Sequence, residues 1–182
     1  MVRVWTIQAP QVLEALRSGL VWRAGESRVG LHWLPAYRWM AREMRDRVGV
    51  PQDQRQMPIW LWHQWRGVGQ AMPDLRCGGH LPRGLHGVRI ELELDEARVL
   101  RSDFDLWHYV LNGWYLPESL DDEREFDARP DPRRIQSSWR RIFDLAWRNP
   151  RYVAAHASRS IQGVTWELRP GDLRRSTSFV AR

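Results

Sequence analysis

The segment PIWLWHQW, residues 58–65, is the feature that most restricts what this chain can fold into. Read as a strand, it places large side chains on both of its faces, with Ile59, Leu61, His63 and Trp65 on one and Trp60, Trp62 and Gln64 on the other. Apolar groups on both faces are typical of a central strand in a sheet that is covered on both sides. The sequence therefore predicts a sheet with packed layers above and below it.

Periodicity elsewhere predicts further strands and helices. Strands are expected over residues 2–8, over 88–94 (VRIELEL, which alternates cleanly) and twice in the tail, before and after the Pro-Gly turn at 170–171. Helices are expected from Pro10 to about Gly19, over 35–48 with a surface Glu43–Arg47 pair, from Pro132, capped by Asp131, to Asn149, and in a short segment with Tyr152, Val153 and His156. Because strands and helices do not alternate strictly, we predict one α+β domain over residues 1–182, with a mixed or antiparallel sheet and flanking helices. The long loop 66–87 and an acidic loop over 118–132 are expected as internal insertions.

The stretch SDFDLWHYVLNGWYLP, residues 102–117, combines acidic, imidazole and aromatic groups. Ser102 precedes Asp105 at capping-box spacing, so a short helix is expected to begin here, with Asp103 and Asp105 in its first turn. Asp105 and His108 are three residues apart and would share a helix face, as an acid–base pair or metal ligands would require. The alternative is a capping aspartate and a histidine that is hydrogen-bonded in the core.

The composition favours an anionic partner. All 28 basic residues are arginine, the formal net charge is +6, and the isoelectric point is near 10.5. Arginine suits phosphate groups and stacks on aromatic rings. Among the 12 tryptophans, Trp139 and Trp147 are interleaved with arginines of the basic segment 133–151, and a second basic segment spans 169–182. Such segments bind nucleic acid; the alternative is an aromatic core beneath a solvated basic face.

Several classes of protein are disfavoured. Cys77 is the only cysteine, so an intrachain disulfide is excluded. Cys77, His80 and His86 are possible zinc ligands, but their spacing matches no standard site, and we predict no metal. The start of the chain lacks a signal-peptide core and no apolar run approaches the roughly 20 residues of a membrane span, so a cytoplasmic protein without a membrane partner is expected. No phosphate loop, dinucleotide fingerprint or nucleophile elbow is present.

Four segments of the chain resemble one family. WTIQ, PIWLWHQW, ELELDEARVLRSDFDLWHYVLNGWYLP and IQGVTWELRPGDLRRSTSFVAR are similar to a family of short bacterial proteins known as a domain of unknown function. The resemblance spans nearly the whole chain, and it implies no particular activity.

A second, more remote resemblance implies a chemistry. VWTIQAPQVLEALRSGLVW, VRIELELDEARVL and VTWELRPGDL are similar to segments of small ADP-ribosyltransferases that modify DNA or RNA. The resemblance implies that Glu167, with Gln162 as its rival, is the catalytic glutamate of the terminal strand and that Thr6 is a catalytic residue of the first strand. Asp105 and His108, chosen for the spacing described above, are kept as further catalytic residues. It also implies NAD as the cofactor, bound by Gln8, Trp5, Arg76 and Gln162, with nicotinamide stacked on a tryptophan and arginines holding the pyrophosphate.

Two other functions remain open at this point. The first is a non-enzymatic nucleic-acid-binding module, similar to a PUA barrel, in which the arginine and tryptophan surface carries the function. The second is an interaction protein of a bacterial defence or toxin system. The leading hypothesis is an ADP-ribosyltransferase-like enzyme that uses NAD to modify a nucleic acid or another acceptor.

Overall fold

A six-stranded sheet, antiparallel at every neighbouring pair, organises the computed structural model, which describes residues 1–182. In spatial order its strands are β6 (Leu100–Asp103), β7 (Ile161–Thr165), β4 (Ile59–Gln64), β1 (Val2–Gln8), β5 (His86–Leu94) and β9 (Leu173–Val180). β4 lies inside the sheet, between β7 and β1, as its two apolar faces predict.

A second, three-stranded antiparallel sheet has the order β3-β2-β8, with β3 (Gln56–Met57), β2 (Trp22–Gly25) and β8 (Glu167–Leu168). It lies beside the main sheet because β3 leads into β4 and β7 leads into β8. Neighbouring residues of these short strands point to opposite faces, and this separates two pockets described below.

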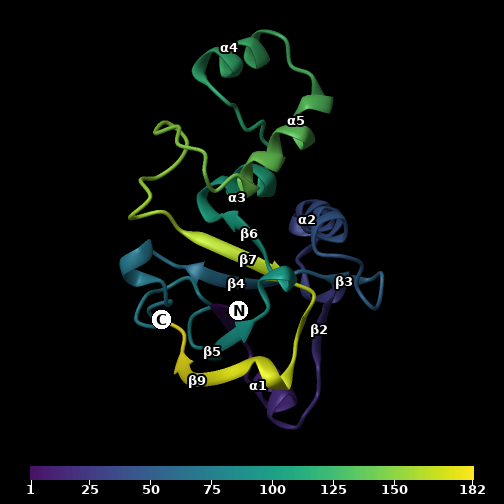
Figure 1. Ribbon diagram of the computed structural model, residues 1–182, viewed down its shortest axis with the longest axis vertical. Helices are drawn as coiled ribbons and strands as arrows, with labels where there is room; N and C mark the ends of the chain where they lie inside the picture. Colours follow the sequence, from purple (N-terminus) through teal and green to yellow (C-terminus); the bar gives the residue numbers. More distant parts are fainter.

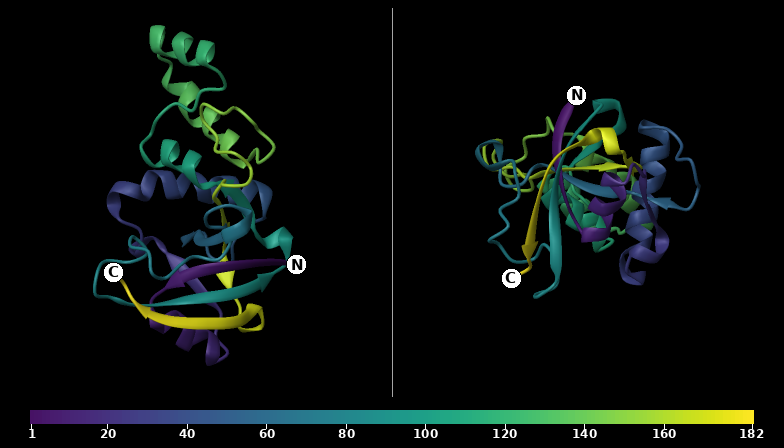
Figure 2. Two further views of the ribbon diagram at one scale, coloured as in Figure 1. Left: turned by 90° about the vertical axis from the view of Figure 1, so that its left-hand side faces the viewer. Right: turned by 90° about the horizontal axis from the view of Figure 1, so that it is seen from below.

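The helices form the outer layers. The α-helices are α1 (Pro10–Arg17), α2 (Leu34–Arg47), α3 (Phe104–Leu111), α4 (Leu120–Ala128) and α5 (Pro132–Ser138). The 3-10 turns are η1 (Glu26–Arg28), η2 (Leu31–Trp33), η3 (Val68–Gln70), η4 (Glu96–Arg98), η5 (Trp139–Phe143) and η6 (Pro170–Asp172). Figures 1 and 2 show that α4 and α5 project at one end of the molecule, far from β9 and α1. None of the helices is long and apolar enough to cross a membrane.

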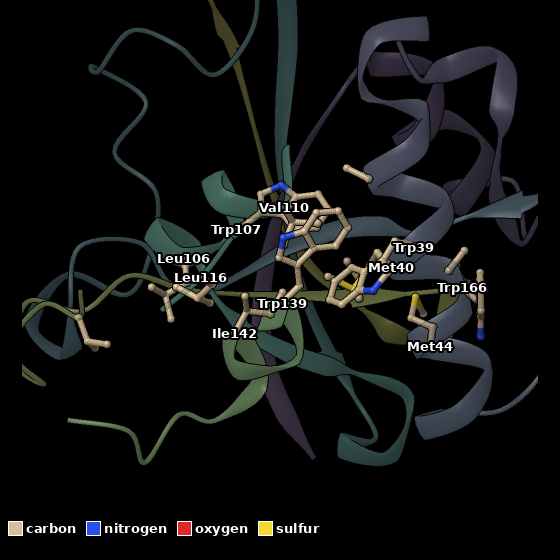
Figure 3. Close-up of a cluster of buried hydrophobic side chains, with 14 residues drawn as sticks. Trp39, Met40, Met44, Leu106, Trp107, Val110, Leu116, Trp139, Ile142 and Trp166 are labelled. Atoms are coloured by element: carbon tan, nitrogen blue, oxygen red, sulfur yellow. The ribbon is translucent and has the colours of Figure 1, made fainter. Parts of the chain in front are cut away.

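Each face of the main sheet has its own core. On one face, Val12, Leu13 and Leu16 of α1 pack against alternate residues of β1, β4 and β5. On the other face, the apolar side of α2 packs with α3, η5 and Val164 of β7. Figure 3 shows this second core, in which Trp39, Trp107, Trp139 and Trp166 are packed with methionine and aliphatic side chains. The two cores confirm that the sheet is covered on both sides.

The structure confirms the α+β class and most of the predicted elements. Strands at 2–8, 58–65 and 88–94, the helices beginning at Pro10 and over 35–48, and the strand-turn-strand tail are present. Asp131 caps α5 by accepting the backbone N–H of Arg133. The Glu43–Arg47 pair also forms, but the Glu43 side chain is buried rather than on the surface, and Arg140 approaches its second oxygen at 3.0 Å.

The predicted start of the 102–112 helix was one residue early. Ser102 belongs to β6, and Asp103 is the cap of α3, accepting the Leu106 N–H at 2.9 Å. Asp103 is also buried in an ion pair with Arg159, whose guanidinium donates to the carbonyl of Leu145. Asp105 lies in the first turn of α3, as predicted.

Three other predicted boundaries were wrong. The acidic segment after residue 118 is not a loop but helix α4, capped by Ser119, because three acidic residues in its first turn suit the positive end of the helix. The helix from Pro132 ends at Ser138 and continues only as the 3-10 turn η5 to Phe143, not to Asn149, because Asp144 leaves helical geometry. The segment with Tyr152 and Val153 forms turns and no helix.

The loop 66–87 has little regular structure, as predicted, but it is anchored to its surroundings. Gly67 has φ +82°, and a Cβ atom there would lie 1.8 Å from the carbonyl oxygen of Ala157. Arg89 donates to the carbonyl of Pro73 at 2.6 Å, and His80 Nε2 donates to that of Asp74 at 2.9 Å. The loop therefore holds its side chains in fixed positions.

Candidate functional site

An aromatic cleft of about 350 Å³ opens beside the centre of the main sheet. Its aromatic walls come from four parts of the chain: Trp22 of β2, Tyr37 of α2, Trp60 and Trp62 of β4, and His80 of the long loop. Gln8 and Arg28 are the other polar residues that line it. We call this site the aromatic cleft. Its size and its mixture of aromatic walls with a few polar groups are typical of small-molecule sites.

The sequence of β4 explains how two of these rings reach the cleft. Trp60 and Trp62 are two residues apart in a strand and so share a face. The Trp60 ring lies 4.7 Å from Trp107 of α3 and 5.7 Å from Tyr37 of α2, which hold it in place. The Trp62 ring lies 4.8 Å from Phe104 of α3. Both tryptophans are half-buried, so each keeps part of its surface for a ligand.

A short hydrogen-bond chain fixes the polar wall of the cleft. Gln8 Nε2 donates to Thr6 Oγ1 at 2.7 Å, and Thr6 Oγ1 donates to the carbonyl of Trp60 at 2.8 Å. This network orients the Gln8 amide so that its oxygen remains an acceptor. Thr6 is buried and acts as a positioning residue, while Gln8 lines the cleft.

Arg28 and Tyr37 add charge and a hydroxyl to the site. The Arg28 guanidinium stacks on Trp22, with its central carbon 4.6 Å from the ring centroid, and its side chain has no carboxylate partner. Burial raises the pKa of the Tyr37 hydroxyl, and the nearby Trp60 N–H lowers it by a smaller amount. The Trp60 N–H itself makes no hydrogen bond of normal geometry. Tyr37 is therefore protonated at neutral pH and can donate a hydrogen bond.

Two other predicted cofactor-binding residues, Trp5 and Gln162, do not line the cleft. Both pair in register with Trp62, and Ser102 pairs with Gln162, so the four side chains form one row across β1, β4, β7 and β6. Trp5 Nε1, Gln162 Nε2 and Ser102 Oγ are buried without a protein partner. Of the four predicted residues, Gln8 thus lines the cleft and Thr6 holds it, whereas Trp5 and Gln162 lie beside Trp62 in the sheet.

Glu167 lies in a different pocket. Its oxygens accept bonds from Arg23 and Arg169, each at 2.7 Å. Partial burial opposes ionisation, but the bond from Arg169 and the charge of Arg23 hold the pKa of Glu167 below its ordinary value. Trp22 lines the aromatic cleft while its neighbour Arg23 lines the polar pocket, so the three-stranded sheet separates Glu167 from Gln8.

Asp105 and His108 are both exposed on α3 and do not bond to each other through their side chains. His108 Nδ1 donates to the carbonyls of Phe104, at 3.1 Å, and Asp105, at 3.3 Å. Partial desolvation and the neighbouring carboxylate of Asp103 raise the pKa of Asp105. The acidic residue with the strongest contacts in this stretch is instead Asp103, whose partner Arg159 lies 56 residues away and leaves no local signal in the sequence.

Arg76, predicted to bind the cofactor, lies outside the aromatic cleft, and the possible zinc ligands of the long loop do not come together. Arg76 pairs with Asp74 at 2.7 Å, and 80% of its side chain is exposed. His80 faces the aromatic cleft, whereas His86 is exposed at the start of β5. No group of three histidine, cysteine or acidic side chains is arranged to hold a metal ion.

The fold and the cleft define this chain as a small antiparallel α+β protein with an aromatic ligand-sized site. Residues 3–131 match a family model described as domain of unknown function (DUF3841), which covers more than two thirds of the chain. The protein belongs to this family, as the first of the two sequence resemblances predicted. No curated protein and no solved structure gives a significant match.

Proposed function

We propose that the aromatic cleft binds a nucleotide, with NAD as the first ligand to test. The observation that carries the proposal is the arrangement of Trp22, Trp60 and Trp62 around a cleft that also contains an unpaired arginine. A planar base stacks on indole rings, and each stacked base contributes about 1–3 kcal/mol. Arg28 supplies a guanidinium for the phosphates.

The polar wall suits an amide or a base edge. Gln8 offers its amide oxygen as an acceptor, held in place through Thr6, and Tyr37 offers a hydroxyl donor. A nicotinamide carboxamide and the amino edge of adenine each present the complementary groups. These contacts favour a nucleotide over a purely apolar ligand of the same size.

An ADP-ribosyl transfer is the reaction that the remote sequence resemblance supports. In that reaction the bond between ribose C1′ and the nicotinamide nitrogen breaks, an acceptor nucleophile bonds to C1′ and loses its proton, and neutral nicotinamide leaves. A carboxylate beside the ribose would stabilise the developing positive charge. Because Glu167 faces the other side of the three-stranded sheet, it acts only on a ligand that extends round the sheet edge. The geometry therefore supports nucleotide binding more directly than transfer.

Isothermal titration calorimetry with NAD, AMP and adenosine tests binding. Trp62→Ala should weaken NAD binding roughly 5-fold to 100-fold, which corresponds to the stacking contribution of one base. Trp114→Ala is the matched control, because Trp114 is 58% exposed and lies outside the cleft. Arg28→Ala should weaken AMP more than adenosine, since only AMP carries a phosphate. Absence of saturable binding of any of the three compounds, or equal losses in the two tryptophan variants, would overturn the proposal.

Transfer is tested separately by following nicotinamide release by mass spectrometry in the presence of mixed RNA, DNA and protein acceptors. Glu167→Gln should abolish release while leaving NAD binding in place. Release that survives this substitution would remove the catalytic role of Glu167 and leave the binding proposal intact.

A further inference from the structure

A basic groove follows the outer side of the long loop and the end of β9. It consists of two adjoining hollows that share Leu75 and Arg76. One hollow, of about 820 Å³, is also lined by Arg83, Phe179, Val180 and Arg182; the other, of about 440 Å³, is also lined by Met72, Pro73, Asp74 and Arg89. We infer that this arginine groove binds the phosphodiester backbone of a single-stranded nucleic acid.

The side-chain charges of the groove are strongly unbalanced. Four arginines line it (Arg76, Arg83, Arg89 and Arg182), against one acidic side chain, Asp74. Arg83 and Arg182 are exposed, and neither has a carboxylate within salt-bridge distance. A groove with this excess of guanidinium groups is suited to consecutive phosphates.

The other arginine-rich segment of the chain is largely neutralised. Arg134 pairs with Asp122, Arg141 with Glu118 and Arg151 with Glu123. Trp139 is buried, as in the alternative of an aromatic core beneath a basic face, and its N–H donates to the carbonyl of Trp114. The basic segment 133–151 is thus largely an ion-paired face over a core, whereas Arg83 and Arg182 of the groove have no carboxylate partner.

The groove is held in shape by the backbone. Gly84 N–H donates to the carbonyl of Ala181 at 2.9 Å, and Ala181 N–H donates to that of Leu85 at 2.8 Å, so Arg83 and Arg182 stay close together. Phe179 packs against Gly87, where a Cβ atom would come within 2.7 Å of its ring. A groove that keeps its shape loses little conformational entropy when it binds a ligand.

An aromatic ring among arginines favours a single strand over a duplex. Phe179 is half-buried in the groove, and bases of a single strand can stack on such a ring while arginines contact the phosphates. Duplex readers instead place a helix or a two-stranded ribbon in the major groove, and the elements here are one edge strand and a loop. The proposal does not depend on nucleotide binding in the cleft, because no residue lines both the cleft and the groove.

Fluorescence polarisation with labelled oligonucleotides of mixed sequence tests this inference in the full chain. RNA single strands, DNA single strands and DNA duplexes are titrated at several salt concentrations. With three or four phosphate contacts, the logarithm of the binding constant should fall with the logarithm of salt with a slope of about −2 to −3. Stronger binding of either kind of single strand than of duplex supports the inference, and the RNA and DNA arms then identify which polymer is bound.

The decisive variant is Arg76→Gln with Arg83→Gln. It should weaken single-strand binding at least 10-fold and reduce the salt slope by about 1.4, for two lost contacts. The matched control is Arg124→Gln with Arg129→Gln, which removes the same charge from α4 and its C-cap at the opposite end of the molecule (Figure 1) and should change affinity less than 2-fold. Equal losses in the two variants, no loss in either, or a preference for duplex would overturn the inference. Thermal melting of both variants confirms that each is folded.

Discussion

The buried ion pair between Asp103 and Arg159 is the contact whose loss should cost the fold most. The two side chains are only 1% and 2% exposed, respectively. Asp103 also caps α3, and Arg159 donates to the carbonyls of Leu145 and Trp147. One pair of charges therefore ties β6 and α3 to the long segment that leads into β7.

Asp103→Asn removes the charge of Asp103 but keeps the oxygen that caps α3. The Asn oxygen can still accept the Leu106 N–H, so the helix keeps its first turn. Arg159, however, would be left as a buried charge without a counterion. Removing one member of a buried pair destabilises proteins by about 3–5 kcal/mol, so the free energy of unfolding should fall by that amount. For a chain of this size the melting temperature should drop by roughly 6–20 °C.

Urea unfolding followed by circular dichroism measures the loss. Asp105→Asn is the control, because Asp105 lies in the same helical turn, is exposed, and should cost less than about 1 kcal/mol. Replacing both members, Asp103→Leu with Arg159→Met, should recover much of the stability, since no unpaired charge remains. If Asp103→Asn costs less than about 1 kcal/mol, the pair is hydrated in solution and the reasoning from burial is refuted.

Three further predictions concern the sites and the loop. Thr6→Val leaves the Gln8 amide and the Trp60 carbonyl without their hydrogen-bond partner. It should weaken NAD binding several-fold by calorimetry and lower the free energy of unfolding in urea by about 1–3 kcal/mol. Unchanged affinity would remove Thr6 from the site. Gly67→Ala should lower the free energy of unfolding by about 2 kcal/mol or more, because the backbone there is left-handed and the Ala157 carbonyl blocks the new methyl group. Gly69→Ala, where the methyl group would meet open space, should be nearly neutral in the same unfolding assay. The pKa of Glu167 in the folded protein lies below the ordinary value of 4.5, so its ionised form contributes stability that is fully present above pH 4.5 and is lost as the pH falls through the folded-state pKa. On acidification the wild-type protein should therefore lose more free energy of unfolding than Glu167→Gln. Parallel pH profiles for the two proteins would contradict this.

The strands were predictable because their patterns are local. β4 has apolar side chains on both faces and β5 alternates, and these patterns depend only on which faces are buried. Helix α4 also had a local signal, since Ser119 accepts the N–H of Asp122 at 3.2 Å in a spacing that the sequence displays. It was misread because a run of acidic residues suggested a solvated loop.

The sites were less predictable because their parts come from distant segments. Trp60 and Trp62 share a face by strand geometry, but the opposite wall of the cleft is built by Trp22 and His80, whose surroundings have no periodic pattern. The resemblance that suggested Gln8 and Thr6 selected one residue that lines the cleft and one that holds it, yet it also selected Glu167, which lines a different pocket. Consecutive residues of β2, Trp22 and Arg23, line two different pockets, and the sequence does not show which residue lines which pocket unless the neighbouring strands are known.

The long loop is the element that relates the two proposed sites. Gly79 and His80 line the aromatic cleft, while Arg76 and Arg83, only a few residues to either side, line the arginine groove. The rings of His80 and Phe179 lie 6.2 Å apart, so the cleft and the groove are separated by about one layer of side chains. An ordered loop of this length with little regular structure is uncommon in a compact domain, and loops held by a rigid scaffold often carry function. The hydrogen bonds that fix this loop to β5 and β9 hold side chains toward both hollows, which is the arrangement expected if the loop serves recognition rather than connection alone.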